Sequence, residues 1–290
     1  MRYRTAIIGP GRLGTLLAVA CSRAGHRVVG VAGGSESSRA GLADSVAGVR
    51  THDTPGEAVV GADLVLLAVP DDAIVPVVRD LARADALHSG HRLVHVAGSV
   101  GLGALDLARR AGASVAACHP AMTVPDGARD PDLLVGTAWA VTAAGDDRTW
   151  AHALVRDLGG DPVDVPESAR VLYHAGLTLG ANAVGAAVAA ARQALLGAGL
   201  REPERFLGPL VAASVANVLR DGATALTGPV VRGDVGTVER HLRALTDDLP
   251  HLADAYRALT EAVLAQAGPS LDDPTVRRLR AAIAEQPCNG

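Results

Sequence analysis

The stretch that decides the fold is Gly9-Pro10-Gly11-Arg12-Leu13-Gly14, whose glycines follow the spacing Gly-x-Gly-x-x-Gly. It comes directly after the apolar run Thr5–Ile8, which is typical of a buried strand, and it opens the helical pattern Leu13–Ala24. Alone, the spacing is a weak signal, but between a strand and a helix it predicts a phosphate-binding turn. Gly9 would allow the tight turn, Gly11 a close approach to a pyrophosphate, and Gly14 close packing of helix on strand.

Strand-like and helix-like segments alternate outward from this turn as far as residue 165. Asp63–Val69 is a continuous apolar run of the kind expected for a strand buried on both faces. Other expected strands are Arg27–Ala32, Leu93–Ala97, Ser114–Cys118, Thr137–Thr142 and Pro162–Val165. This alternation predicts an α/β Rossmann-type doubly wound parallel sheet with right-handed crossovers.

After Pro166 the pattern becomes helical, which predicts an all-α C-terminal domain. Helices are expected at 167–196, 203–220, 234–249, 252–267 and 274–285. We therefore divide the chain into a dinucleotide-binding domain, 1–165, and a helical substrate and dimerisation domain, 166–287. The charge-free stretch Val171–Ala191 is rich in Ala and Gly and carries His174 and Asn182, so we interpret it as a buried helix rather than a membrane span.

Composition excludes several classes of protein. A formal charge of −4 and 2% aromatic residues argue against a nucleic-acid or membrane-surface protein. The three cysteines are odd in number and widely spaced, which predicts neither a disulfide framework nor a metal site and favours a reducing, cytoplasmic location. All 27 basic residues are arginines, so no lysine can act as an acid or form a Schiff base. His26, His52, His88 and His91 are expected at the surface.

Residues after the second strand indicate which dinucleotide would bind. An acidic residue there would hold the ribose hydroxyl of NAD, whereas Ser35, Ser37 and Arg39 suit the 2′-phosphate of NADPH. Glu36 is the residue that does not fit this choice, and Arg39 could instead be an ordinary surface residue. Ligands of such folds bind at the carboxyl ends of strands. The full set of expected cofactor contacts is therefore Gly9, Gly11, Arg12, Leu13, Gly14, Ser35, Ser37, Arg39, Val69, Pro70 and Ser99.

Two groups of polar residues interrupt the apolar pattern of the helical half. His174, Thr178 and Asn182 recur at four-residue intervals, which spans about 80° of arc on an α-helix. Such a stripe needs hydrogen-bond partners, either neighbouring protein groups or a ligand. Tyr173 is interpreted as a core residue.

The second group is the loop Thr227–Asp234 with the helix that follows. Arg232 offers a planar fork for a substrate carboxylate, while Asp234, Thr237 and His241 share one flank of the helix. The alternatives are an Asp234 placed for the helix dipole and an Arg232–Asp234 salt bridge. His119, after the strand Ser114–Cys118, is either a proton donor or an ordinary loop histidine.

Five segments together resemble a family of bacterial Rossmann-like oxidoreductases whose helical C-terminal domain long lacked an assigned function. They are GPGRLG (9–14), LLAVPDDAI (66–74), CHPAMT (118–123), YHAGLTLGAN (173–182) and ALTGPVVRGDVGTVERHL (225–242). The resemblance implies helices packed as in the C-terminal domains of 6-phosphogluconate dehydrogenase and pyrroline-carboxylate reductase, and hence a homodimer. It implies site residues at His119, His174, Asn182, Thr227, Arg232, Asp234, Thr237 and His241. Val124 departs from it, because the family usually has Phe there.

The leading hypothesis is an NADPH-dependent reductase of a small 2-oxo acid, with ketopantoate as the best single guess because some family members are implicated in its reduction to pantoate. Arg232 would clamp the carboxylate, Asn182 would orient the carbonyl, and His241 or His119 would deliver the proton. Ketopantoate reductases of the established kind use a lysine, which this chain does not have. One alternative is an imine or prephenate-like substrate, and the other is a protein that binds NADP without turnover.

Overall fold

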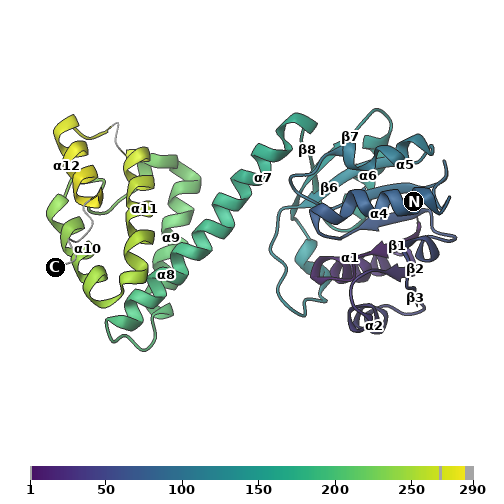
Figure 1. Cartoon of the computed structure of the whole chain (residues 1–290), viewed down its shortest axis with the longest axis horizontal. Helices are drawn as coiled ribbons and strands as arrows, with labels where there is room; N and C mark the ends of the chain where they lie inside the picture. The colour runs from purple at the N-terminus through teal and green to yellow at the C-terminus, as the bar shows by residue number, and fades with distance from the viewer. Residues whose placement is uncertain (1, 268–269, 285–290) are drawn as a thin grey trace. The chain divides into compact units, whose positions relative to one another are not determined.

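The computed structural model describes residues 2–267 and 270–284, and the chain divides into two compact units. The first runs to Leu177 and the second begins at Thr178. Figure 1 shows strands and helices in the first unit and helices alone in the second. The predicted fold class, an α/β Rossmann-type sheet followed by a helical region, is confirmed. The domain boundary predicted at residue 165 stays a prediction.

One eight-stranded sheet forms the centre of the first unit. Its strands are β1 (Arg4–Ile8), β2 (Arg27–Ala32), β3 (Arg50–Thr51), β4 (Leu64–Leu67), β5 (Arg92–His95), β6 (Ser114–Pro120), β7 (Ala138–Ala143) and β8 (Asp161–Asp164). They lie in the order β3-β2-β1-β4-β5-β6-β7-β8. All neighbours are parallel except β6 and β7, which agrees with the mostly parallel sheet expected. The strand order reverses direction between β1 and β4, so the turn after β1 lies at a topological switch point.

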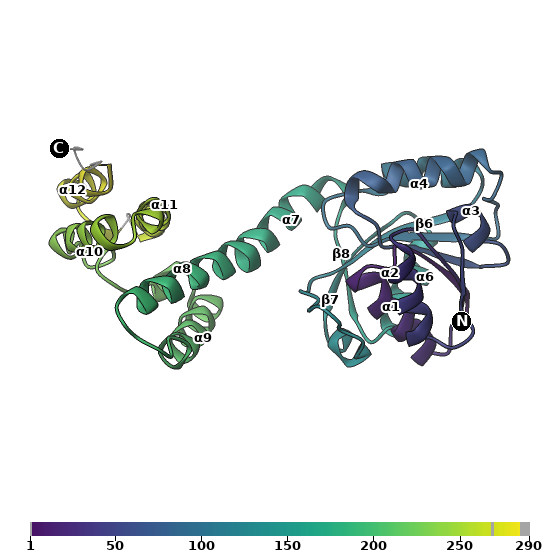
Figure 2. The same ribbon diagram turned by 60° about the horizontal axis from the view of Figure 1, so that its bottom comes forward.

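Helices cover both faces of this sheet. They are α1 (Arg12–Arg23), α2 (Glu36–Ser45), α3 (Pro55–Ala58), α4 (Asp71–Arg83), α5 (Asp106–Arg110) and α6 (Asp147–Asp157), with short 3₁₀ turns η1 (Leu102–Leu105), η2 (Pro131–Leu134) and η3 (Glu167–Ala169). Figure 2 shows α1 and α4 on opposite faces. Successive residues of β1 face different cores: Ile7 packs in the cluster that contains α1 and α6, and Ile8 in the one that contains α4. This alternation explains why the strands are apolar throughout.

A continuous helical run begins in the first unit and leads into the second. The elements are α7 (Arg170–Thr178), the π-helical turn η4 (Leu179–Ala183), α8 (Val184–Gly197), α9 (Glu204–Asp221), the 3₁₀ turn η5 (Gly222–Ala225), α10 (Val235–Asp248), α11 (Pro250–Ala267) and α12 (Asp273–Ala284). The second unit has its own small core, formed by α10, α11 and α12 around Val238, Leu242 and Leu279. The expected helices are all present, with ends shifted by only a few residues.

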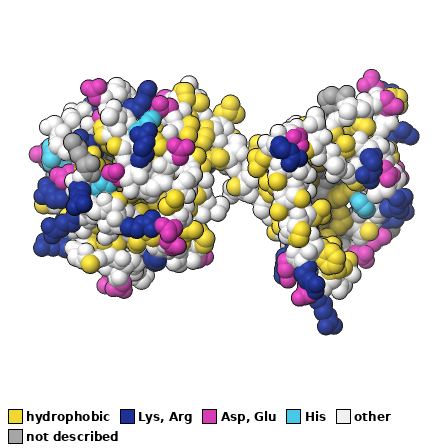
Figure 3. Space-filling model, turned by 180° about the vertical axis from the view of Figure 1, so that it is seen from behind, with side chains coloured by type: hydrophobic (Ala, Val, Ile, Leu, Met, Phe, Trp, Pro, Cys, Tyr) yellow, Lys and Arg dark blue, Asp and Glu magenta, His cyan; other side chains and the backbone are white. Residues whose placement is uncertain are grey.

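The expectation that Val171–Ala191 is buried is wrong for the chain by itself. Neither α8 nor α9 contains a buried residue, and Leu172 and Leu179 expose 77% and 69% of their surface. Hydrophobic side chains accordingly gather on the surface of the helical unit in Figure 3. The helix Glu167–Gly197 is also long and apolar enough to cross a membrane, although a single such helix is a weak indication. Its apolar surface finds no cover within the described residues.

Candidate functional site

The glycine turn after β1 has the geometry that the sequence predicts. Gly9 has a φ of +101°, and a Cβ atom there would lie 2.5 Å from the carbonyl oxygen of Ala68. A Cβ on Gly14 would lie 1.9 Å from the Gly9 oxygen, so helix α1 packs directly on the turn. By contrast, apart from the adjoining backbone, no heavy atom of the described residues lies within 4 Å of the position of a Cβ on Gly11. Gly9 and Gly14 are therefore required by packing, whereas Gly11 leaves open space at the turn.

Helix α1 presents an open N-terminus at this turn. Gly11 is its N-cap, no side chain caps it, and its first turn carries no acidic residue. The first backbone N–H groups of a helix have no partner within the helix and attract anions. Arg12 adds a positive charge, paired 3.2 Å away with the exposed carboxylate of Asp126, and Leu13 packs against the core. The turn can thus accept a phosphate group.

A cluster of hydroxyl groups lies at the start of α2, after β2. Ser35 caps α2 by accepting from the Ser38 N–H at 3.1 Å, and its Oγ lies 2.9 Å from the Oγ atoms of both Ser37 and Ser38. The Arg39 guanidinium is 15% exposed, donates to the Gly34 carbonyl at 3.2 Å and pairs with Asp53 at 3.1 Å. Arg39 is therefore not an ordinary surface arginine. Its counter-ion Asp53 is 91% exposed, so another anion can compete for it.

The remaining predicted cofactor contacts lie along the same edge of the sheet. The backbone of Val69 borders the glycine turn, because a Cβ on Gly9 would lie 2.9 Å from the Val69 nitrogen. Pro70 is the N-cap of α4. Ser99, after β5, donates through its hydroxyl to Asp71 at 2.9 Å. These positions follow the carboxyl ends of β4 and β5, where ligands of doubly wound sheets bind.

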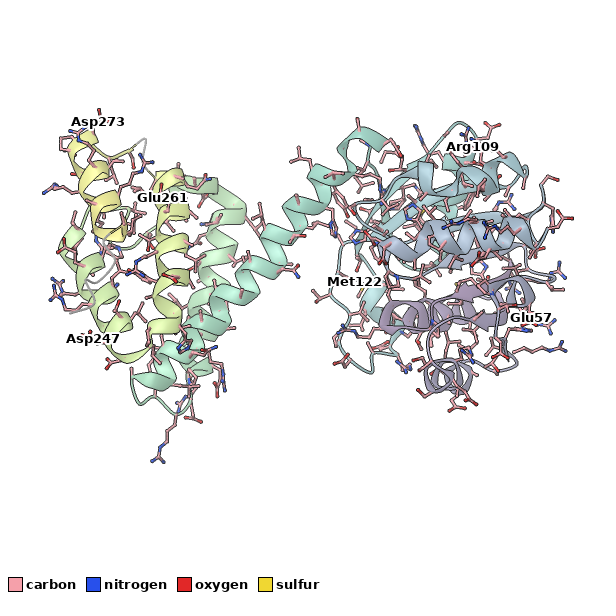
Figure 4. The ribbon with its side chains drawn as sticks, viewed as in Figure 1. Glu57, Arg109, Met122, Asp247, Glu261 and Asp273 are labelled. Atoms are coloured by element: carbon pink, nitrogen blue, oxygen red, sulfur yellow. The ribbon has the colours of Figure 1, made fainter. Side chains whose placement is uncertain are left out.

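A tyrosine–histidine pair lies at the same edge of the sheet, at the end of the neighbouring strand β6. His119, near the end of β6, lies with its Nδ1 2.9 Å from the Tyr173 hydroxyl of α7. The His119 ring meets the rings of Tyr173 and His174 edge to face, with 5.8 Å between centroids in both cases. Met122, labelled in Figure 4, marks the loop that follows β6. The structure thus brings together the predicted residues His119 and His174 and adds Tyr173 to them.

Burial keeps this pair neutral at physiological pH. Desolvation is the main cause that lowers the pKa of His119 to about 4, and the neighbouring His174 and Arg170 lower it further. Desolvation also raises the pKa of Tyr173, against an opposing effect of Arg170. A neutral His119 can accept one proton or donate one, and a protonated tyrosine hydroxyl is a proton donor. The pair is suited to proton transfer, but His119 by itself is not a cationic acid at neutral pH.

Beneath the pair lies a fully buried cation, Arg170. Its two terminal nitrogens donate to the Thr142 hydroxyl at 2.9 Å and to the Ala97 carbonyl at 2.5 Å. His95, at the end of β5, is also fully buried, and desolvation is the main cause that lowers its pKa to about 4. His95 Nε2 lies 3.2 Å from the Gly101 carbonyl oxygen. The hydrogen-bond partners of the guanidinium are therefore neutral oxygens, while the carboxylates of Asp71 and Glu167 act on it only electrostatically.

The start of the long helical run packs closely against two glycines that follow β5. A Cβ on Gly98 would lie 2.2 Å from Cδ2 of His174, and one on Gly101 would lie 1.9 Å from a carboxylate oxygen of Glu167. Glu167 also accepts from the Leu102 N–H at 3.0 Å. These contacts explain why residues 166–177 group with the sheet although their pattern is helical.

The predicted residues of the second unit include one with a clear structural role. Asp234 is the N-cap of α10 and accepts from the backbone N–H of Thr237 at 3.0 Å and from its hydroxyl at 2.7 Å. Those hydrogen bonds are the main cause that lowers the Asp234 pKa. The Arg232–Asp234 salt bridge, which was the alternative to a substrate-binding role, is not formed, and the exposed Arg232 guanidinium has no ion-pair partner among the described residues.

The other residues predicted in this unit are exposed. Thr227 lies in the loop before α10, and His241 Nδ1 lies 2.8 Å from the Tyr256 hydroxyl. Asn182 lies in the π-helical turn, so the arc calculated for a regular α-helix does not hold from Thr178 to Asn182. Its side chain makes no hydrogen bond within the described part of the chain. Asp234 and Thr237 are thus two predicted residues of this unit that are joined by hydrogen bonds.

Sequence reasoning missed Tyr173, Arg170 and Asp71 as members of this site. Tyr173 was expected in the core, yet it is one of only three tyrosines in a chain with 2% aromatic residues, and it adjoins the predicted His174. Arg170 is the last charged residue before the charge-free stretch. A charged residue directly before such a stretch can indicate that its side chain is buried and hydrogen-bonded to other elements. Asp71 lies in the segment LLAVPDDAI (66–74), but the sequence did not single out its carboxylate.

Fold and site together define a Rossmann-like α/β protein with a helical C-terminal unit. Residues 1–120 match the family described as a Rossmann-like domain, and residues 137–263 match the family described as a domain of unknown function, DUF2520. No match was found among the curated proteins.

Solved structures resemble the whole chain. A Bacteroides fragilis protein described as a candidate NADP oxidoreductase has a TM-score of 0.73 and 23% identity, with 90% of this chain and 98% of that one covered. The imine reductase of Myxococcus stipitatus in complex with NADP⁺ has a TM-score of 0.66 and 20% identity, with 95% and 99% covered. The pyrroline carboxylate reductase of Plasmodium falciparum with NADP bound has a TM-score of 0.58 and 14% identity, with 97% and 98% covered. Because these identities are all below 25%, the similarity shows that the fold is shared.

Proposed function

We propose that this protein is an NADPH-dependent reductase of a small C=O or C=N compound. The observation that carries the proposal is the Tyr173–His119 pair, which lies on the same carboxyl edge of the sheet as the open glycine turn. A dinucleotide bound across this edge would extend from the turn towards the pair. Solved structures of similar fold that hold NADP support the same assignment.

The residues present fit the cofactor. Gly11 leaves the space that the pyrophosphate needs, and the uncapped start of α1 supplies backbone N–H donors. Ser35, Ser37 and Arg39 would hold the 2′-phosphate, with Arg39 exchanging the exposed Asp53 for it. Val69, Pro70 and Ser99 would line the path to the nicotinamide. When bound, NADPH supplies a hydride to the substrate carbon.

The chain's own residues would supply the proton. His119, as its Nδ1–H tautomer, donates to the Tyr173 oxygen and so directs the Tyr173 hydroxyl proton towards the substrate. The proton passes to the substrate oxygen or nitrogen, and solvent later reprotonates the tyrosine. This assignment replaces the direct donation by His119 or His241 considered from the sequence, because burial keeps His119 neutral.

A 2-oxo acid is the substrate class that best uses a tyrosine acid, because reduction of a ketone leaves an oxyanion that must be protonated. Ketopantoate is our best single candidate. Arg232, exposed and without an ion-pair partner among the described residues, would bind the carboxylate, and Asn182 would orient the carbonyl. Thr227, Asp234, His174 and His241 would complete the substrate side, with Asp234 acting through the helix that it caps.

An imine is the second candidate, favoured by the likeness to the imine reductase and the pyrroline carboxylate reductase. A protonated imine already carries its positive charge and needs no further acid when it accepts a hydride. Replacing Tyr173 by Phe would then have little effect on turnover. A prephenate-like acid belongs to the same alternative.

The test follows NADPH absorbance with the purified protein and a panel of ketopantoate, other 2-oxo acids and cyclic imines. We expect turnover of a 2-oxo acid that Tyr173→Phe lowers by about 10²-fold or more. Turnover of imines alone, unchanged in Tyr173→Phe, would favour the second candidate. NADPH binding with no turnover of any compound, and no effect of Arg232→Ala or Asn182→Ala, would leave a protein that binds NADP without catalysis.

The proposal includes a homodimer formed through the helical unit in the cytoplasm. The apolar surfaces of α8 and α9 require a cover in water, and a second copy presents the same surfaces.

Cys21 and Cys118 are free thiols, which suits a reducing compartment, whereas Cys288 lies outside the described residues.

A further inference from the structure

Arg170 is a buried cation that forms no ion pair with any of the described residues. Its side chain is fully buried, and both of its hydrogen bonds go to neutral oxygens, those of Thr142 and Ala97. Its Nε is buried and has no hydrogen-bond partner. An unpaired charge inside a protein is costly, and an anion that forms near it would offset part of this cost.

The nearby carboxylates are engaged elsewhere. Asp71 accepts from the Ser99 hydroxyl at 2.9 Å, and Glu167 accepts from the Leu102 N–H at 3.0 Å. Neither forms an ion pair with Arg170 in the described part of the chain. The titratable and charged groups that surround Arg170 and Tyr173, from α4, β5, β6, η3 and α7, are Asp71, His95, Cys118, His119, Glu167 and His174.

We infer that Arg170 is a positioning residue that stabilises the phenolate of Tyr173 and so makes this tyrosine an effective acid. Arg170 lies one helical turn before Tyr173 on α7, which places both side chains on the same face of the helix. This inference rests on the proposed function. In the step itself the O–H bond of Tyr173 breaks, an O–H bond forms on the substrate oxygen, and the positive charge of Arg170 would stabilise the negative charge left on the tyrosine oxygen. The role needs a cation, and this chain contains no lysine to supply one.

The second unit contains a matched reference for this arrangement. Tyr256 lies 2.8 Å from His241 Nδ1, and their rings meet edge to face at 5.8 Å, as do those of Tyr173 and His119. Both tyrosines are partly buried, and desolvation raises the pKa of each. An arginine opposes that rise at Tyr173, whereas a hydrogen bond with Thr260 opposes it at Tyr256. The two similar tyrosine–histidine pairs therefore differ in two respects: Tyr173 has a buried cation near it, and Tyr256 has a hydrogen bond with Thr260.

The experiment titrates tyrosinate absorbance of the full-length protein without cofactor, and assigns each signal by subtracting Tyr173→Phe and Tyr256→Phe. In Arg170→Met we expect the pKa of Tyr173 to rise by about 1–3 units above that of the wild type. Arg170→Lys, which keeps the charge, should titrate close to the wild type. An unchanged Tyr173 pKa in folded Arg170→Met would overturn the inference.

Two controls separate charge from packing. Thr142→Val removes a hydrogen-bond partner of Arg170 but keeps the cation, and Arg109→Met removes an exposed arginine of α5 (Figure 4). Both should leave the Tyr173 titration unchanged. If Arg170→Met does not fold, a Thr260→Val protein decides, because it lacks the hydrogen bond that lowers the pKa of Tyr256. In this protein Tyr173 should titrate at lower pH than Tyr256, and an equal or higher value contradicts the inference.

Kinetics give the complementary measurement. With a carbonyl substrate, Arg170→Met should lower kcat at neutral pH by about tenfold or more and move the alkaline limb of its pH profile to higher pH. A tenfold loss with an unmoved limb would assign Arg170 a purely structural role. The titration needs no substrate, so the absence of any turnover would contradict the proposed function while the titration still decides the role of Arg170.

Discussion

Gly11 and Gly14 lie three residues apart in one turn, yet the addition of a methyl group should have opposite consequences at the two positions. Gly11 has an extended backbone conformation and empty space around its missing Cβ, so Gly11→Ala should cost less than about 1 kcal/mol of stability. It should nevertheless weaken NADPH binding by about tenfold or more, because the methyl group occupies the approach to the pyrophosphate.

Gly14→Ala should instead affect stability more than NADPH binding. Its methyl group would overlap the Gly9 carbonyl oxygen, so the helix must move and stability should fall by about 1–3 kcal/mol. Urea denaturation and calorimetric titration with NADPH measure the two effects separately. Unchanged NADPH binding in a folded Gly11→Ala protein would remove the turn from the cofactor site.

Buried histidines make the stability of the first unit depend on pH. His26 and His91, which the sequence placed at the surface, are 3% and 2% exposed, and desolvation is the main cause that lowers the pKa of each. His95 and His119 have pKa values lowered to about 4 from 6.5. When the folded-state pKa is below the unfolded one, the unfolded chain takes up protons first as the pH falls. Stability is then complete above about pH 6.5 and declines towards pH 4.

For His95 alone, a pKa of about 4 in the folded state corresponds to a loss of about 2 kcal/mol between pH 7 and pH 5. The free energy of unfolding, measured with urea at both pH values, should therefore fall by about 2 kcal/mol or more. His95→Gln should show a smaller decline than the wild type. Equal stability of the wild-type protein at the two pH values would show that these histidines are not buried in neutral form.

At the scale of the element, Asp234 illustrates how a predicted site residue can act through its helix. As the N-cap of α10 it satisfies two donors of Thr237. Asp234→Ala should lower the melting temperature by about 2–4 °C, whereas Asp234→Asn, another good N-cap, should stay close to the wild type. Asn and Asp cap helices similarly but differ in charge. Loss of activity in a stable Asp234→Asn protein would therefore assign the carboxylate a direct role.

Elements with local signals could be predicted, and contacts between distant elements could not. The glycine turn and the expected helices of the second half follow from adjacent residues, and all are present. Strand β3 has only two residues and was missed. The antiparallel direction of β7 depends on a long connection after β6, and a chain segment of that length fixes no direction.

In the candidate site, too, the individual segments could be predicted from the sequence, whereas the contacts between them could not. Each half of the Tyr173–His119 pair lies in a segment that the sequence singled out, but 54 residues separate them. Only the docking of α7 on the sheet brings them together, and that docking depends on Gly98 and Gly101, whose missing side chains make room for His174 and Glu167. The burial of Arg170 follows from the same docking. A one-dimensional pattern shows which residues are polar but not which ones are enclosed together.

For the whole molecule, the exposed apolar surface of the helical unit is the feature that the single chain leaves unexplained. On α9, Phe206, Leu210 and Leu219 expose 60%, 63% and 84% of their surface. Apolar residues that are scattered singly are normal on soluble proteins, whereas a contiguous apolar surface indicates a contact. A homodimer satisfies this requirement, because an isologous interface covers the same surface on both subunits.

We therefore predict that Phe206→Glu and Leu210→Glu, alone or together, convert the dimer into a monomer in sedimentation equilibrium. A charge placed in a buried interface must be desolvated without a partner, which costs several kcal/mol and outweighs what one side chain contributes to association. Val60→Glu is the matched control, because Val60 is 77% exposed in the first unit, and it should leave the dimer intact. If the wild-type protein already sediments as a monomer at micromolar concentration, the apolar helices must instead meet a different partner, and the proposed dimer is wrong.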